Sequence, residues 1–256
     1  IHPDHPVKVL LLSHNNIELL PIVLKNLEQL DISYNKLYKI AIDRLLLDYP
    51  RLKYLLISGN QLKKIPPAVY SLANLIDFIA ERNEITDDSN SFESLRYLEN
   101  IDLFLNMYTK IPKMPHSLVS LNMGFNYVRE VDLGLPNLRE LRLSGNNIKM
   151  ISSSCFFPNL TVLELPMNNL DEIPPIKKIA PKLERINLSY NYIKTIPLEF
   201  PESIQKIDMS NNVLNKWEEG MEHLTKLKTL DVSHNHITVV PKLPVQLQEF
   251  NAQFNK

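Results

Sequence analysis

The sequence predicts an α/β solenoid, in which each of many similar turns adds one short strand to a long parallel β-sheet. Three observations support this prediction. One pattern of apolar residues recurs along all 256 residues, an asparagine marks the same place in every copy, and strand-like alternation occurs once per copy. The composition agrees, since 42 residues are Leu and 26 are Asn, whereas only 5 are Gly.

The recurring pattern reads apolar, x, x, apolar, x, apolar, x, x, Asn, x, apolar, and it occurs twelve times. One of the clearest copies runs through Leu138, Leu141, Leu143, Asn146 and Ile148. Successive marker asparagines are 20 to 25 residues apart, at Asn15, Asn35, Asn60, Asn83, Asn106, Asn126, Asn146, Asn168, Asn191, Asn212, Asn235 and Asn255. This regular series predicts a single domain, residues 1–256, of about twelve repeats.

The first half of each repeat predicts a strand. Its fourth and sixth positions are apolar and alternate with polar residues, as in Leu30-Asp31-Ile32-Ser33. A unit of about 22 residues cannot cover its own apolar face. Neighbouring units must therefore stack with their strands side by side and in the same direction, which makes a parallel sheet.

The second half of each repeat often reads apolar-Pro, as in Ile65-Pro66 and Ile196-Pro197, and proline removes the donors that a long helix needs. We expect extended chain and single turns there, with short amphipathic helices at residues 40–49 and 67–72, where the unit is longer. Because these outer segments are bulkier than a strand, the stack should curve, with the sheet on its concave side.

The asparagine at the ninth position turns inward at the end of each strand, where an unsatisfied amide would be costly. A column of asparagines avoids this cost, because each side chain can bond the backbone of its own turn and of the adjacent repeat. We therefore expect the twelve asparagines to lie in one row and to hold the turns together.

The chain resembles the leucine-rich repeat superfamily over essentially its whole length. The resemblance implies a curved, horseshoe-shaped solenoid, but function must be argued from exposed residues. Units such as Ile111-Pro112-Lys113-Met114-Pro115 are similar to those of intracellular members, which are either eukaryotic regulators and signalling enzymes or secreted bacterial effectors. Units of 22 to 25 residues exceed the uniform short repeats of the effectors. We therefore favour the eukaryotic kind, in which such an array precedes a protein phosphatase or an adenylyl cyclase domain.

Charge and motifs exclude several functions. Lys and Arg number 28 against 29 Asp and Glu, which leaves no electrostatic excess for nucleic acid. The five glycines are isolated, so the chain has no Gly-rich phosphate loop. His234-Asn235-His236 is interrupted by a ladder asparagine, and the repeat places no histidine beside Cys155. We expect no enzyme activity, no cofactor and no metal site, and a structural thiol at Cys155.

The longest apolar run, Val9 to Leu12, is too short for a membrane span or a signal-peptide core, and one cysteine cannot build a disulfide framework. These absences predict a cytoplasmic protein that is not inserted in a membrane, and we expect the isolated chain to be monomeric. No capping segment precedes Val7 or follows Asn255, which predicts a fragment of a longer polypeptide.

The remaining functional signal lies at the third, fifth, seventh and eighth positions, which should point away from the core on the concave side or its rim. Most repeats carry Ser at the seventh position, but five repeats do not, among them those with Glu81-Arg82, Phe104-Leu105 and Gly124-Phe125. An apolar centre flanked by charges of both signs is typical of a protein-binding surface. The predicted protein-binding residues are Ile79, Glu81, Arg82, Asp102, Phe104, Leu105, Asn122, Phe125, Arg142, Glu164, Met167 and Arg185.

Two questions about this surface stay open. Phe104, Leu105 and Phe125 could simply pack on one another along the rim. The fifth-position acids could be solvated filler or an acidic groove for a basic partner; they are Asp31, Asp102, Asp208 and Asp231, joined by Glu164. The sequence thus predicts a non-catalytic module that binds a protein partner through its concave face. The alternative is a regulatory or targeting segment of a signalling enzyme whose catalytic domain lies outside this chain.

Overall fold

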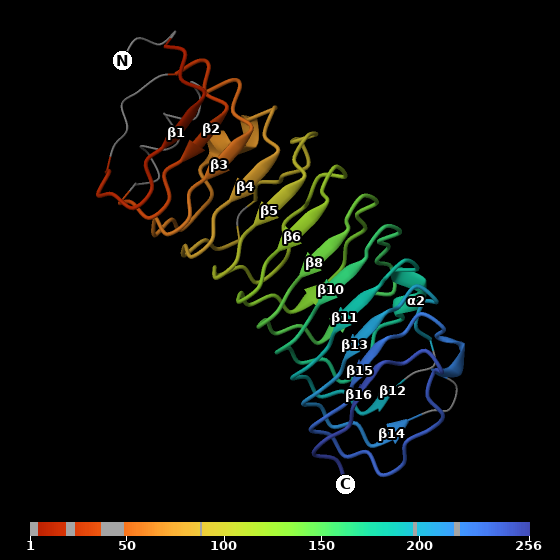
Figure 1. Ribbon diagram of the computed structural model, residues 1–256. Helices are drawn as coiled ribbons and strands as arrows, with labels where there is room; N and C mark the ends of the chain where they lie inside the picture. Colours follow the sequence, from red (N-terminus) through yellow and green to blue (C-terminus); the bar gives the residue numbers. More distant parts are fainter. Residues whose placement is uncertain (1–4, 19–23, 37–48, 88, 197–198, 218–220) are drawn as a thin grey trace. The chain divides into compact units, whose positions relative to one another are not determined.

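The computed structural model describes residues 5–18, 24–36, 49–87, 89–196, 199–217 and 221–256. The chain forms two compact units, unit 1 from Ile1 to Tyr127 and unit 2 from Val128 to Lys256. In both units, stacked turns of the chain each add one strand to a parallel sheet, which confirms the predicted solenoid (Figure 1). The assignment of residues 1–256 to a single domain stays a prediction.

Unit 1 contains six three-residue strands that pair in parallel in chain order. They are β1 (Val9–Leu11), β2 (Gln29–Asp31), β3 (Tyr54–Leu56), β4 (Asp77–Ile79), β5 (Asn100–Asp102) and β6 (Ser120–Asn122). Like positions of the repeat face each other at every step, as where Tyr54 pairs with Asp77. In β2 to β6 the central residue is buried and the residues on either side of it are accessible to solvent.

Unit 2 has six strands of the same kind, also parallel and in chain order. They are β8 (Glu140–Arg142), β10 (Val162–Glu164), β11 (Arg185–Asn187), β13 (Lys206–Asp208), β15 (Thr229–Asp231) and β16 (Glu249–Asn251). Two small parallel sheets form from the second halves of repeats, where the chain is extended as predicted. They pair β7 (Glu130–Val131) with β9 (Met150–Ile151) and β12 (Thr195–Ile196) with β14 (Lys216–Trp217), the latter beside the main strands in Figure 1.

The helices are short. The 3-10 helix η1 (Pro67–Ser71) lies in the predicted segment 67–72, begins with proline and buries Ala68 and Val69. The other predicted helix, residues 40–49, lies outside the described residues except for Tyr49. Unit 2 adds α2 (Ile176–Ile179) and η2 (Met221–His223). All three lie in the second halves of their repeats, after the strand and its turn.

The apolar positions of the pattern fill the core. In the third repeat, Leu52, Leu55, Ile57 and Leu62 expose 3% of their surface or less. Burying a side chain of this size stabilises the folded chain by about 1.5–3 kcal/mol, and the same positions are apolar in every repeat. The core is therefore a column of similar layers, each closed by its neighbours.

The asparagine column is confirmed and has a fixed hydrogen-bond pattern. Asn191 accepts the backbone N–H of Leu170 in the preceding repeat at 3.0 Å, and its Nδ2 donates to Leu165 O in that repeat and to Leu188 O in its own, both at 3.0 Å. Asn106 makes the same three bonds in unit 1, at 2.9 to 3.1 Å. These side chains therefore join two adjacent turns in both units, whereas Asn15, in the first repeat, bonds only its own turn, through Leu12 O and Ser13 O.

Candidate protein-binding surface

The third and fifth positions of each repeat form two columns on the sheet side, because they flank the buried central residue of each strand. In unit 1, Leu56 lies beside Ile79, and Ile79 lies beside Asp102. In unit 2, Arg142 lies beside Glu164, which lies beside Asn187. The structure thus brings the predicted third- and fifth-position residues into adjacent strands within each unit.

The seventh position does not point outward as predicted. Five of the seven serines there are buried, with 5 to 8% of their surface exposed, and Ser13 and Ser144 are half-buried; the five are Ser33, Ser58, Ser189, Ser210 and Ser233. The chain turns inward at this point, so a small hydroxyl can reach the fifth-position side chain, as Ser210 Oγ donates to Asp208 Oδ1 at 2.8 Å. Larger residues, Glu81 and Phe104 among them, are half-buried instead.

The fifth-position acids are not merely solvated. They belong to a hydrogen-bonded frame, by which we mean the backbone of the turns together with the ladder asparagines and the fifth-position side-chain oxygens that bond it. Asp102 Oδ1 accepts the backbone N–H of Phe104 at 2.9 Å, and its Oδ2 accepts a bond from Asn122 Nδ2 at 2.9 Å. Asp31, Asp208 and Asp231 accept the N–H two residues on in the same way. Because Asn122 and Asn187 make this bond too, the frame needs the side-chain oxygen rather than the charge.

Phe104 and Phe125 pack on each other, with ring centroids 5.3 Å apart in an edge-to-face arrangement. Gly124 makes room for this contact, because a Cβ there would lie only 3.1 Å from Phe104 Cδ2. The alternative of rim packing is therefore realised for these two rings. Phe125 nevertheless leaves 43% of its surface exposed, so the pair also offers apolar area to a partner.

Glu81 and Asp102 place two carboxyl groups side by side in unit 1. Burial, then the negative charge of Asp102 and a hydrogen bond with it, raises the pKa of Glu81 above its ordinary value. The charge of Arg82, which is exposed at the next position, acts in the opposite direction but more weakly. A cation brought to this pair would relieve a repulsion that unit 1 leaves in place.

In unit 2, the predicted residues have a different electrostatic setting. Arg142 pairs with Glu140 at 2.7 Å, and the two side chains are partly exposed, at 44% and 37%. Burial raises the pKa of Glu164, while the neighbouring Arg142 acts to lower it. Met167 and Arg185 are exposed on the same side of the repeat. Of the twelve predicted residues, Arg142, Glu164, Met167 and Arg185 belong to unit 2 and the other eight to unit 1.

A feature that the sequence analysis missed is the left-handed backbone at the eighth position. All twelve repeats have φ between 51° and 63° there, at His14, Tyr34, Gly59, Arg82, Leu105, Phe125, Gly145, Met167, Tyr190, Asn211, His234 and Phe254. The conformation costs a residue other than glycine about 1–2 kcal/mol. A lateral hydrogen bond offsets it, as where Arg82 N–H donates to Phe104 O in the next repeat at 2.8 Å.

The eighth position also holds exposed rings that are not among the predicted protein-binding residues. His14 stacks on Tyr34 in unit 1 and His234 stacks on Phe254 in unit 2, with centroids 4.5 and 4.3 Å apart. Tyr190 is exposed in the same column. The usable signal was the run of Tyr, His and Phe at one repeat position, because large rings at an exposed place are typical of binding surfaces.

Cys155 is a buried structural thiol, as predicted. Its Sγ donates to Val131 O at 3.3 Å, and burial raises its pKa, which keeps the thiol protonated and unreactive.

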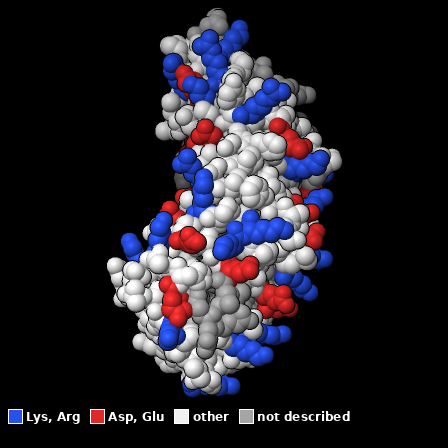
Figure 2. All heavy atoms as spheres, turned by 90° about the vertical axis from the view of Figure 1, so that its right-hand side faces the viewer, with Lys and Arg blue, Asp and Glu red and all other residues white. Residues whose placement is uncertain are grey.

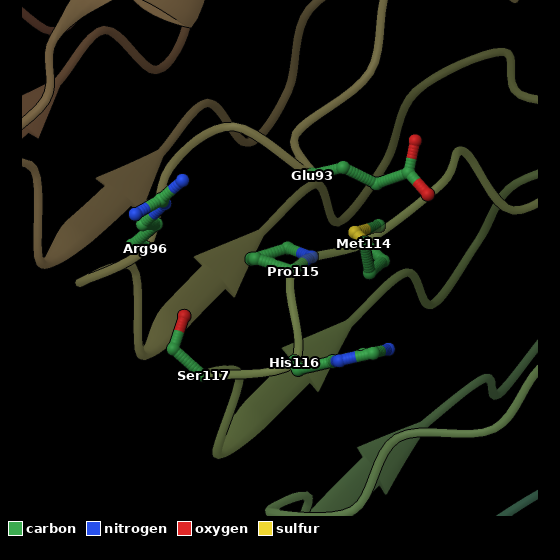
Figure 3. A pocket seen from close by; sticks show the side chains of 6 residues that line it. All are labelled: Glu93, Arg96, Met114, Pro115, His116 and Ser117. Atoms are coloured by element: carbon green, nitrogen blue, oxygen red, sulfur yellow. The ribbon is translucent and has the colours of Figure 1, made fainter.

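A shallow pocket of about 260 Å³ lies away from the strands of unit 1, between one loop that carries Glu93 and Arg96 and the next, Met114 to Ser117 (Figure 3). Two of its polar side chains already have partners within the chain. Glu93 accepts a bond from Ser91 Oγ at 2.9 Å, and Ser117 Oγ donates to Leu98 O at 2.7 Å. The pocket therefore offers few free groups to a ligand.

Other surfaces give no sign of a metal, a membrane span or a polyanion site. Figure 2 shows Lys and Arg interspersed with Asp and Glu over the side seen there, so neither sign of charge dominates it. Across the part of the chain that the structure describes, no three His, Cys, Asp or Glu side chains cluster to hold a metal ion. Within the same residues, no helix is long and apolar enough to cross a membrane.

Family models match the regular repeats of the chain. Models described as leucine rich repeat match residues 51–72 and 181–237, and one described as two copies of the repeat matches residues 136–178. The chain belongs to the leucine-rich repeat superfamily.

Curated leucine-rich repeat relatives resemble this chain over much of its length. Lumican from Gallus gallus is 34% identical over 207 residues, which cover 74% of this chain and 58% of lumican. Fibromodulin from Homo sapiens is 29% identical over 224 residues, covering 80% of this chain and 58% of fibromodulin. The chain thus spans little more than half the length of these relatives.

Solved leucine-rich repeat structures match the fold. The leucine-rich repeat domain of APL1B superposes with a TM-score of 0.86 at 24% identity, covering 98% of this chain and 77% of that one. The functional domain of InlJ from Listeria monocytogenes gives a TM-score of 0.80 at 21% identity, covering 98% and 54%. At these identities the likeness concerns the fold alone.

The prediction of a cytoplasmic, intracellular protein is wrong. Lumican, fibromodulin, podocan-like protein 1 and oligodendrocyte-myelin glycoprotein are extracellular matrix, secreted or cell-surface proteins. The error came from two absences, a missing signal sequence and a missing disulfide framework. Neither absence bears on location in a leucine-rich repeat chain, because the repeat core is closed by stacking and its turns by asparagines.

Proposed function

We propose that this leucine-rich repeat chain is a non-catalytic module that binds a protein partner through the sheet side of its repeats, which the sequence predicts to be concave. The observation that carries the proposal is the sheet side itself, where apolar and charged side chains are exposed on a frame fixed by backbone and asparagine hydrogen bonds. Such a surface loses little conformational entropy when it binds. Leucine-rich repeat relatives bind protein partners, which agrees with this role.

We further propose that the module acts outside the cytoplasm, where its relatives lumican and fibromodulin are found. The relatives lumican and fibromodulin are non-enzymatic leucine-rich repeat proteins, which favours a binding module over a regulatory segment attached to a signalling enzyme.

Quantitative binding to a purified partner tests the proposal. Partners captured from an extracellular extract would be identified, purified and titrated against immobilised chain. Phe104→Asp with Phe125→Asp should weaken binding at least about tenfold while the chain stays folded, because Phe125 is 43% exposed and Phe104 is only half-buried. Tyr97→Asp is the matched control, since Tyr97 is 64% exposed but lies outside the strand and its turn.

Equal weakening by Tyr97→Asp would contradict the proposal, because it would show that the bound surface is not the sheet side. Unfolding of the double phenylalanine variant would mark Phe104 and Phe125 as core residues rather than surface residues, and Met107→Asp, at an exposed position of the same turn, would then take its place.

A further inference from the structure

The sheet side of unit 1 carries more carboxylates than cations. The third, fifth and seventh positions of the first six repeats, here called the unit-1 face, include Asp31, Asp77, Glu81 and Asp102 and no Lys or Arg. Of the ion pairs within 4.0 Å between described residues, those in unit 1 join Lys8, Lys53 and Lys113 to Glu28 or Glu93, outside this face. No described Lys or Arg of unit 1 therefore forms an ion pair with the four acids of this face, and the nearest charge of opposite sign is that of Arg82 at the eighth position, which acts weakly on Glu81.

The order of residues across the strands is regular at the fifth position. The register places Asp31, Leu56, Ile79 and Asp102 in consecutive strands β2 to β5, so two acids flank two apolar residues. Three strand spacings separate the two acids, which is about 14 Å. All four side chains are partly accessible to solvent.

Both acids are held in place by neutral donors. Asp31 Oδ1 accepts the Ser33 N–H at 3.0 Å, and Asp102 accepts bonds from Phe104 N–H and from the Asn122 amide. These bonds fix the carboxylates without cancelling their charge. Burial and then the charge of Asp102 raise the pKa of Glu81, and the opposing charge of Arg82 is the weaker influence.

We propose that the unit-1 face binds an extended cationic protein segment that lies across the strands, with Lys or Arg side chains four residues apart and an apolar side chain midway between them. In extended chain, residues i and i+4 are about 13 Å apart and lie on the same face as residue i+2. The two cations then reach Asp31 and Asp102 while the apolar residue covers Leu56 and Ile79. This inference rests on the proposed function, since it specifies the chemistry of the partner that the sheet side would bind.

A fluorescent nine-residue peptide with two lysines four apart and a leucine midway provides the probe, titrated against the whole chain by anisotropy at about 50 mM salt. Asp31→Asn with Asp102→Asn should weaken binding at least about tenfold. Asparagine can keep the bond to the turn, as Asn122 and Asn187 do natively. Raising the salt to about 200 mM should weaken binding to the unaltered chain as well.

Asp208→Asn with Asp231→Asn is the matched control in unit 2. Asp231 bonds Ser233 N–H and Asn251 Nδ2 as Asp102 bonds Phe104 N–H and Asn122 Nδ2, so any cost to the frame is alike. The control should change the affinity less than about twofold.

Three results would overturn the assignment: equal weakening by both double variants, equal binding of a peptide with glutamates in place of the lysines, or no binding at millimolar peptide. If any of these occurs while a protein partner is still lost on Phe104→Asp with Phe125→Asp, only this inference fails. If the protein partner binds equally well to Phe104→Asp with Phe125→Asp and to Asp31→Asn with Asp102→Asn, the proposed function fails together with this inference.

Discussion

Units 1 and 2 share one frame but differ in the charges that they place on it. At the third, fifth and seventh positions, unit 1 carries four acids and no cation, whereas unit 2 carries three cations, Arg142, Arg185 and Lys206, among five acids. In unit 2 one of these cations is already paired, Arg142 with Glu140 at 2.7 Å. The same frame is present with either set, so it does not depend on the charge pattern, and that of unit 1 is free to serve a partner.

The frame itself does not differ between the units. The ladder asparagine, the fifth-position oxygen that accepts the N–H two residues on, and the left-handed eighth residue recur in both. These three features involve backbone groups and side-chain oxygens, and none of them requires a net charge. Substitutions in matched pairs, one in each unit, can therefore separate the frame from the surface.

The largest effect is expected from the ladder. Asn106→Ala in unit 1 and Asn191→Ala in unit 2 should each lower the free energy of unfolding by about 1–3 kcal/mol, because the backbone groups that each amide joins would lose a buried partner. Equilibrium unfolding in urea measures this. A loss in only one of the two variants would show that the frame is not equivalent in the two units.

The next effect concerns the glycine of an eighth position. Gly59→Ala should lower the free energy of unfolding by about 1–2 kcal/mol, because its φ is +63° and a Cβ would lie 2.5 Å from the ring of Tyr34. Gly134→Ala is the control in unit 2, since the nearest atom would be 3.6 Å away, an ordinary contact. Thermal unfolding of both variants provides the comparison, and equal melting temperatures would contradict the expected strain.

The fold was predictable because the information is repeated twelve times. A single Asn or Leu says little, but the same spacing in every repeat identifies strand, turn and ladder at once. The inward turn at the seventh position was not predicted, since Ser33 or Ser210 could equally face solvent in an alternating strand. The left-handed eighth residue was also hidden, because Leu105, Phe125 and Met167 are residues that rarely adopt it.

The candidate site was predictable only in part. The sequence identifies which positions face outward, and so finds Ile79, Asp102 and Phe104. It does not show that Asp102 is bonded to Asn122 or that Phe104 rests over Gly124, because those contacts join different repeats. It also could not show which carboxylates lack a cation, since that depends on where long Lys and Arg side chains lie.

A smaller change in stability is expected at Glu81 and Glu164, the two carboxyl groups with raised pKa values. Glu81→Gln and Glu164→Gln should each stabilise the chain at neutral pH, because the folded state disfavours the ionised carboxyl at both places. The upward direction of both pKa shifts determines the pH range in which the substitution stabilises the chain. As pH falls through the raised pKa, the folded chain takes up the proton first, so the advantage of glutamine shrinks and is gone below about pH 4.

Salt sharpens this comparison between the units. At Glu81 a nearby acid adds to the cost of ionisation, so the gain from Glu81→Gln should decrease when salt screens Asp102. At Glu164 a nearby Arg142 favours ionisation, so the gain from Glu164→Gln should increase when salt screens that attraction. Melting temperatures at neutral pH and two salt concentrations measure both trends, and trends of the same sign would contradict the different settings.

The smallest effect is expected at the edge of unit 1, where Glu28 accepts bonds from Lys8 at 3.0 Å and Lys53 at 2.8 Å. Hydrogen bonds from these two lysines, Lys53 first, lower the pKa of Glu28 from 4.5 to about 2. The ion pairs therefore contribute their full stability above about pH 5 and lose it as pH falls from 4.5 towards 2. Glu28→Gln should lower the melting temperature slightly at neutral pH and not at all near pH 2, and added salt should reduce the difference. Glu184→Gln is the control, since its neighbours at the same repeat position, Thr161 and Gln205, carry no charge; a matching loss there would show that the effect does not come from the lysines.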